Sequence, residues 1–113
     1  MPDLEAFRKD LFDILDSIAA GGTDFYAGFA EMRCMWFDDH WTRDPHGLVQ
    51  DGVISEAEYE ILNRFSETFR NAYPKGTRDP VQDLRKLQDD PTWLSVVRAA
   101  KQAKAELGAL AIS

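Results

Sequence analysis

Hydrophobic positions recur along the chain at steps of three and four residues, which is the period of an α-helix. In the first segment the apolar positions are Leu4, Phe7, Leu11, Ile14, Leu15 and Ile18, with polar residues between them. Gly21-Gly22 follows, and glycine often ends a helix because it readily adopts the left-handed conformation. The pattern therefore predicts an amphipathic helix from Leu4 to Ile18 that packs one face against a core.

A second helix is predicted from Thr23 to about Trp41. Thr23 suits the N-cap, and Asp24 in the first turn complements the helix dipole. This segment is apolar on most sides, through Phe25, Tyr26, Phe29, Met32, Met35, Trp36 and Phe37. A helix that is apolar all round is usually central to a bundle, so we expect this helix to lie in the middle of the fold.

Residues 42–54 read as the longest connection, because they carry turn residues at Asp44-Pro45, Gly47 and Asp51-Gly52. The run Ser55-Glu-Ala-Glu58 is a capping box that opens a third helix, with Ile54 placed for a hydrophobic staple. The predicted inner face of this helix consists of Ala57, Ile61, Leu62, Phe65, Phe69 and Tyr73, before Pro74-Lys75-Gly76 ends it.

Proline opens two more helices, because it suits the first helical position. Asp79-Pro80 begins a short one with Val81, Leu84 and Leu87. Asp90-Pro91 begins a longer one with Trp93, Val97, Ala100, Ala103 and Leu107 inside. No segment alternates with period two, and no linker or repeat divides the chain. We therefore predict an all-α fold, one compact bundle of four to five helices over residues 1–113, with Trp36, Phe65 and Phe69 buried.

Composition agrees with a globular domain, since 44% of the 113 residues are hydrophobic and 12% are aromatic. The single Cys34 excludes an internal disulfide. It stands between Arg33 and Met35 in the most apolar predicted helix, so we expect a buried small hydrophobe and not a catalytic thiol. No run of about 18 apolar residues occurs, and the N-terminus is acidic. We expect a cytoplasmic protein with no membrane partner. No phosphate loop or nucleophile motif appears, so we do not expect an enzyme.

Charge is the most informative part of the composition. The 20 acidic and 13 basic residues give a net charge of -7 and a pI near 4.7, which argues against nucleic acid as a partner. Residues 1–60 carry 14 acids and 4 bases, a charge of -10, whereas residues 61–113 carry 6 acids and 9 bases, a charge of +3. Such a negative side steers basic partners toward it, although solubility alone would also explain it.

Two segments resemble metal sites without completing one. Residues 47–58 align with a calcium-binding EF-hand loop, but its first and third ligand positions fall on Gly47 and Val49, which offer no side-chain oxygen. Asp38-Asp39-His40, Asp44 and His46 could ligate zinc, yet they lack a paired spacing on one helix. We therefore expect neither a metal nor another cofactor.

The stretch from residue 38 to residue 60 is the candidate contact surface for a protein partner. It holds seven carboxylates with Arg43 as the only base, and Trp41 is the natural aromatic anchor for an interface. The proposed partner-binding residues are Asp38, Asp39, Trp41, Asp44, Asp51, Glu56, Glu58 and Glu60.

The layout of the whole chain resembles the helical immunity proteins of the colicin D type and of contact-dependent inhibition systems. The resemblance begins with the amphipathic first helix and the break at Gly21-Gly22. It continues through Thr23, Phe25 and Phe29 into an aromatic segment that contains Trp36 and Trp41. After the cap from Ser55 to Tyr59, the matching positions are Leu62, Phe65, Tyr73, Leu84 and Leu87. The extended C-terminal helix from Pro91 departs from the shortest members. The resemblance implies a bacterial antitoxin that occludes the basic active face of a cognate toxin, which we expect to be a nuclease. The alternatives are a non-enzymatic regulatory subunit that binds its partner through an apolar groove, and a small enzyme or ligand-binding bundle, which would need a pocket with converging polar groups.

Overall fold

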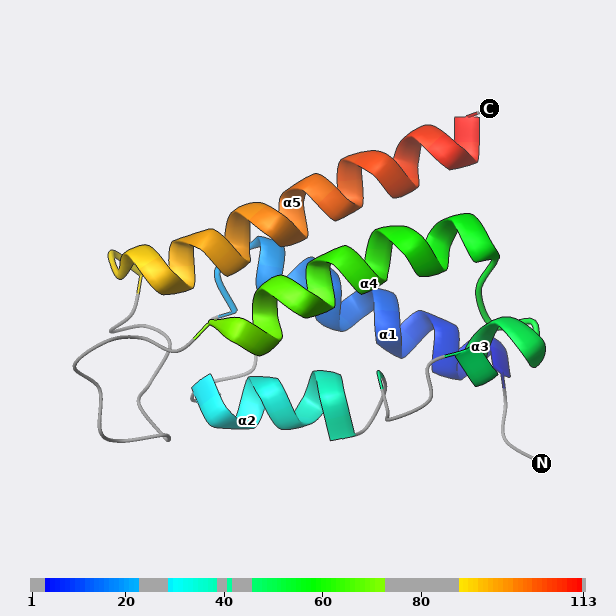
Figure 1. Cartoon of the computed structure of the whole chain (residues 1–113), viewed down its shortest axis with the longest axis horizontal. Helices are drawn as coiled ribbons and strands as arrows, with labels where there is room; N and C mark the ends of the chain where they lie inside the picture. Colours follow the sequence, from blue (N-terminus) through cyan, green and yellow to red (C-terminus); the bar gives the residue numbers. More distant parts are fainter. Residues whose placement is uncertain (1–3, 23–28, 39–40, 42–45, 73–87, 113) are drawn as a thin grey trace.

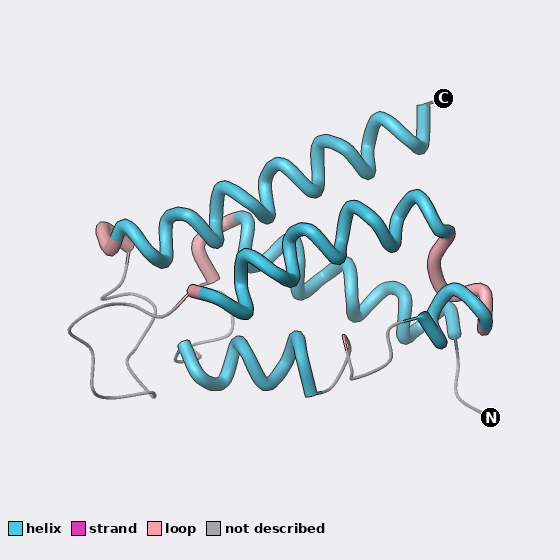
Figure 2. Tube along the Cα trace, viewed as in Figure 1, coloured by secondary structure: helices cyan, strands magenta, loops and turns pink. Residues whose placement is uncertain are grey.

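Helices make up nearly all of the part of the chain that the computed structural model describes, which is residues 4–22, 29–38, 41, 46–72 and 88–112. The elements are α1 (Leu4–Ala19), α2 (Phe29–Arg33), the π-helical turn η2 (Cys34–Asp38), α3 (His46–Gln50), α4 (Glu56–Asn71) and α5 (Pro91–Ile112). No strand occurs among these residues, as Figure 2 shows. The predicted all-α class is therefore confirmed.

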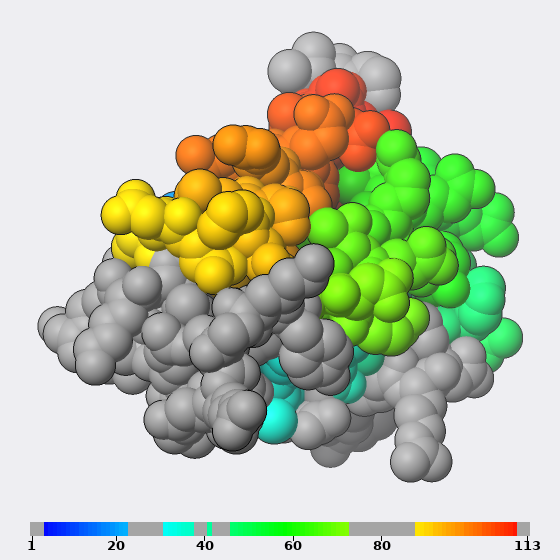
Figure 3. Space-filling view, turned by 60° about the vertical axis from the view of Figure 1, so that its left-hand side comes forward, coloured from blue at the N-terminus to red at the C-terminus, as the bar shows by residue number. Residues whose placement is uncertain are grey.

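The long helix α5 packs along both α1 and α4, while α2 lies on the side of α4 away from α5 (Figure 1). In the space-filling view, α5 and α4 share one face of the molecule (Figure 3). The radius of gyration is 14.0 Å, close to the roughly 13 Å of a compact chain of this length. Among the described helices, none is long and apolar enough to cross a membrane.

Aromatic and aliphatic side chains from every long helix meet in one core. Trp36, Phe65 and Phe69 are at most 2% exposed, so their predicted burial is confirmed. The predicted faces of α1 and α5 also point inward, except that Leu4 is 40% exposed and the buried part of α1 begins at Leu11. Leu4 is the first residue of α1, in the turn that precedes the buried part of the helix.

The turn after α1 requires glycine. Gly21 has a φ of 105°, and a Cβ atom there would stand 2.6 Å from Oε1 of Gln88. Its carbonyl oxygen accepts hydrogen bonds from Nε1 of Trp93 and Nε2 of Gln88, each at 3.1 Å. The predicted stop at Gly21-Gly22 therefore also ties the end of α1 to the beginning of α5.

The second predicted helix differs from the expectation. Its cap at Thr23 and the residues up to Gly28 lie outside the described residues, and beyond Arg33 the α-helix gives way to η2. The backbone N–H of Trp41 donates to the carbonyl of Trp36, five residues earlier. In an α-helix, residues five apart are rotated by about 140°, so the wider turn lets both tryptophans face the core. Cys34, the first residue of η2, is exposed, so the prediction of a buried thiol is wrong.

The predicted connection of residues 42–54 contains a short helix, α3, which the turn residues did not suggest. The capping box of α4 is confirmed: the N–H of Glu58 donates to Oγ of Ser55 at 3.1 Å, and the N–H of Ser55 donates to Oε1 of Glu58 at 2.9 Å. Ile54 is 4% exposed, as a staple residue should be. Ala57, however, is exposed, so the buried face of α4 begins one turn later, at Ile61.

The predicted start of α5 is confirmed by its cap. Oδ1 of Asp90 accepts the N–H groups of Thr92 at 2.9 Å and Trp93 at 3.1 Å, and Pro91 is the first helical residue. Tyr73, the stop at Pro74–Gly76 and the helix predicted from Asp79 lie outside the described residues.

Candidate functional site

The eight predicted contact residues separate into groups with different surroundings. Asp39 and Asp44 lie outside the described residues, and Asp38 is the last residue of η2. Asp51, Glu56 and Glu60 are exposed, whereas Trp41 and Glu58 are held by other parts of the protein.

Trp41 is 1% exposed and cannot serve as the surface anchor that we expected. Its ring stacks on Trp36, with centroids 6.0 Å apart, and on Tyr59, with centroids 5.4 Å apart. The same side-chain size that favours tryptophan in an interface also favours it in a core. The sequence therefore cannot distinguish an interface tryptophan from a core tryptophan, and the fold shows that Trp41 is a core residue.

His46, a candidate metal ligand in the sequence, continues this aromatic stack. Its ring lies 4.5 Å from that of Tyr59, and Nε2 is 3.3 Å from the Tyr59 hydroxyl. The pair joins α3 to α4. No group of three or more potential metal-ligating side chains comes together among the residues that the structure describes.

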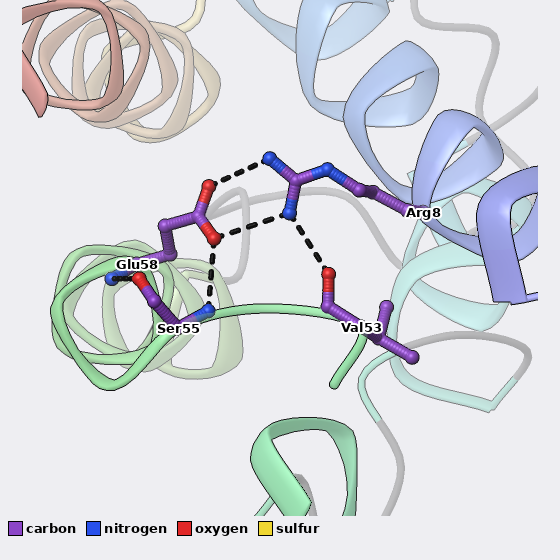
Figure 4. A network of polar contacts seen from close by, with 4 residues as sticks. All are labelled: Arg8, Val53, Ser55 and Glu58. Atoms are coloured by element: carbon purple, nitrogen blue, oxygen red, sulfur yellow. Dashed lines mark hydrogen bonds and ion pairs between the residues drawn. The ribbon is translucent and has the colours of Figure 1, made fainter. Parts of the chain in front are cut away.

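Glu58 is bound to Arg8 of α1, which the sequence did not indicate. The guanidinium donates from Nη2 to Oε2 at 2.8 Å and from Nη1 to Oε1 at 3.1 Å, and Nη1 also donates to the carbonyl of Val53 at 2.8 Å (Figure 4). The Arg8 hydrogen bonds lower the pKa of Glu58 below its usual value, with help from the backbone of Ser55. Glu58 is thus part of the fold and not a charge offered to a partner.

Asp51, Glu56 and Glu60 remain as an acidic face, the name we keep for these three residues. Glu56 and Glu60 are neighbours on the outer side of α4, and Asp51 lies in the turn before it. Within the described residues none of the three forms an ion pair. Arg64, four residues after Glu60, instead binds Glu106 of α5 at 3.2 Å. These carboxylates are available to a cationic partner.

A groove opens where the first half of α1, the beginning of α4 and the end of α5 meet. It has a volume of about 440 Å³ and is lined by Arg8, Phe12, Ser55, Glu58, Leu107, Gly108 and Leu110. The Arg8–Glu58 ion pair, drawn in Figure 4, is part of this lining. Sequence reasoning missed the groove because its residues come from three segments that are far apart along the chain.

Arg33 is a further residue that the sequence analysis did not single out. Its Nη1 donates to the carbonyls of Phe69 at 2.7 Å, Arg70 at 3.2 Å and Ala72 at 3.4 Å. A cation at these carbonyls satisfies the open C-terminal end of α4 and complements its dipole. Arg33 therefore fastens α2 to α4 and has a structural role.

In comparisons with known proteins, no family model, no curated protein and no solved structure matches this chain.

Proposed function

We propose that this chain is an immunity-type protein, which binds a basic protein toxin through its acidic face and thereby blocks the toxin. The observation that carries the proposal is the exposure of Asp51, Glu56 and Glu60 without an internal counter-charge among the described residues. A nuclease must be cationic where it holds nucleic acid, so an inhibitor that covers that surface should be anionic.

The arrangement of charges on α4 supports the same proposal. Like charges four residues apart, as at Glu56 and Glu60, destabilise a helix by a few tenths of a kcal/mol. The positive end of the α4 dipole offsets this cost only in the first turn, which includes Glu56 but not Glu60. A cationic partner would supply the counter-charge that the described part of the chain does not provide.

The test is binding to the basic C-terminal domain of a secreted protein encoded beside this one. Raising the salt concentration should slow association steeply, because exposed charges are screened beyond about 8 Å at physiological ionic strength. The triple variant Asp51→Asn, Glu56→Gln, Glu60→Gln should associate roughly tenfold more slowly than the wild type at low salt.

The matched control removes three charges elsewhere, by Asp10→Asn, Glu31→Gln and Asp89→Asn. These acids are exposed and form no ion pair within the described residues, so the net charge changes equally. Association of the control should stay close to that of the wild type. Equal slowing by both triple variants would mean that net charge, and not this face, steers binding. Binding indifferent to salt and to both variants would reject the proposal.

A further inference from the structure

We propose that the groove between α1, α4 and α5 binds an uncharged, apolar stretch of polypeptide from a protein partner. This inference uses none of the acidic-face residues, so it stands or falls apart from the proposed function.

The walls of the groove are partly apolar, through Phe12, Leu107 and Leu110, and the Arg8 guanidinium lies over the Phe12 ring, 4.5 Å from its centroid. Phe12 and Leu107 pack against the core from its edge, and Leu110 is 38% exposed. The volume of about 440 Å³ lies within the range of roughly 300–1,000 Å³ that is usual for binding pockets. There is room for apolar side chains of a partner between α1 and α5.

Arg8 supplies hydrogen-bond donors that the described part of the protein does not use. Of its five N–H groups, three bind Glu58 and Val53. The Nε–H and one Nη2–H have no acceptor among the described residues, and the side chain is 43% exposed where it lines the groove. Buried under a ligand, these donors would need oxygen acceptors.

The charge balance of the groove indicates which acceptor fits. The positive charge of Arg8 is already matched by Glu58, whose carboxylate would repel a second carboxylate. A main-chain carbonyl accepts the same hydrogen bonds without adding a charge. An apolar peptide segment therefore complements the groove better than a fatty acid does.

Gly108 leaves room for the close approach of another backbone. Glycine destabilises a helix interior relative to alanine, and this position lies inside α5. A Cβ atom at Gly108 would meet nothing within 4 Å, so packing within the protein does not require glycine there. The missing side chain keeps the groove open on the α5 side, where a peptide backbone would lie.

The probe is the doubly blocked peptide Ac-Leu-Ala-Leu-NH2, titrated into the 15N-labelled full chain. We expect saturable shifts of the amide signals of Phe12, Leu107 and Gly108. Gly108→Leu fills the groove and should weaken peptide binding at least tenfold, with no loss of melting temperature. Ala105→Leu places the same side chain at an exposed position of α5 outside the groove lining and should leave binding unchanged.

Several results would overturn the inference. Shifts at the groove with octanoate but not with the peptide would assign it to an apolar carboxylate. The same shifts on concentrating the chain alone would assign it to a second copy. The inference would also be rejected if the peptide did not bind, if its shifts mapped to another surface, or if binding survived Gly108→Leu. Should Gly108→Leu fail to fold, the shift map of the wild type still decides between these outcomes. The triple variant of the acidic face should bind the peptide as the wild type does. Failure of the groove inference can therefore be distinguished from failure of the proposed function.

Discussion

At the scale of single residues, the indole N–H groups of the three tryptophans differ in what they bind. Nε1 of Trp36 donates to Oγ of Ser66 at 2.9 Å, and Nε1 of Trp93 donates to the carbonyl of Gly21. Nε1 of Trp41 has no acceptor within the described residues although the side chain is buried. A buried donor without an acceptor costs about 1–3 kcal/mol, so the Trp36 and Trp93 bonds help to define the core.

Removing the acceptor of Trp36 should therefore destabilise the protein. Ser66 is fully buried, and its hydroxyl also donates to the carbonyl of Leu62 at 2.7 Å. We expect Ser66→Ala to lower the free energy of unfolding by about 1–3 kcal/mol in chemical denaturation. The control is Thr68→Ala on the same helix, where an exposed hydroxyl is removed and the change should stay within about 0.5 kcal/mol. Equal losses in the two variants would contradict a specific role for the indole bond.

The Arg8–Glu58 pair should make stability depend on acid pH. Because Arg8 lowers the pKa of Glu58, the pair stabilises the fold above the ordinary carboxyl pKa of 4.5 and loses this effect as pH falls through the lower folded value. Glutamine still completes a capping box, so Glu58→Gln removes the ion pair selectively. At pH 7 this variant should be less stable by about 1 kcal/mol, and the difference should shrink as the pH falls below 4.5.

Thermal melts of both proteins between neutral and acid pH measure this effect. Glu60→Gln serves as the control, since Glu60 is exposed and forms no ion pair within the described residues. Its difference from the wild type should be small at every pH. A constant gap between wild type and Glu58→Gln down to low pH would show that the loss is not electrostatic.

At the scale of elements, α4 holds the bundle together. Phe65 packs edge-on against Trp36 of η2, with ring centroids 5.1 Å apart, and Phe69 meets Trp93 of α5 at 6.3 Å. Arg33 binds the C-terminal carbonyls of the same helix, while Glu58 in its first turn binds α1. Each neighbouring element thus contacts α4 at a different position along the helix.

The central position of Phe65 gives a direct test of this packing. Phe65 is 2% exposed, and Phe65→Ala should lower the free energy of unfolding by about 3–5 kcal/mol. Glu67→Ala, on the exposed side of α4, should change it by no more than about 0.5 kcal/mol. Equilibrium denaturation measures both, and a loss below about 1 kcal/mol for Phe65→Ala would place this face of α4 away from the core.

At the scale of the whole molecule, two surfaces with different chemistry begin from the first turns of α4. The acidic face lies on its outer side and in the turn before it, whereas Ser55 and Glu58 line the groove toward α5. The first suits a cationic partner through long-range attraction, and the second suits an apolar segment through contact. A partner that uses both would combine fast association with slow dissociation.

Features that depend only on neighbours along the chain could be predicted without the three-dimensional structure. Helical period, the glycine stop after α1, the capping box at Ser55 and the Asp90-Pro91 start of α5 are local, and local geometry suffices to read them. The all-α class and the burial of Phe65 and Phe69 follow from the same periodicity.

Which polar and aromatic side chains remain available to a partner depends on how the helices pack against one another. Arg8 and Glu58 are 50 positions apart, and nothing local shows that this carboxylate is neutralised while Glu56 and Glu60 are not. Trp41 is drawn inside because the π-helical turn changes the rotation between it and Trp36, an effect that a uniform 3.6-residue period cannot express. A contact such as Arg8–Glu58 forms because packing between helices brings the two side chains together. The distance between them in space cannot be derived from the spacing of residues within one segment.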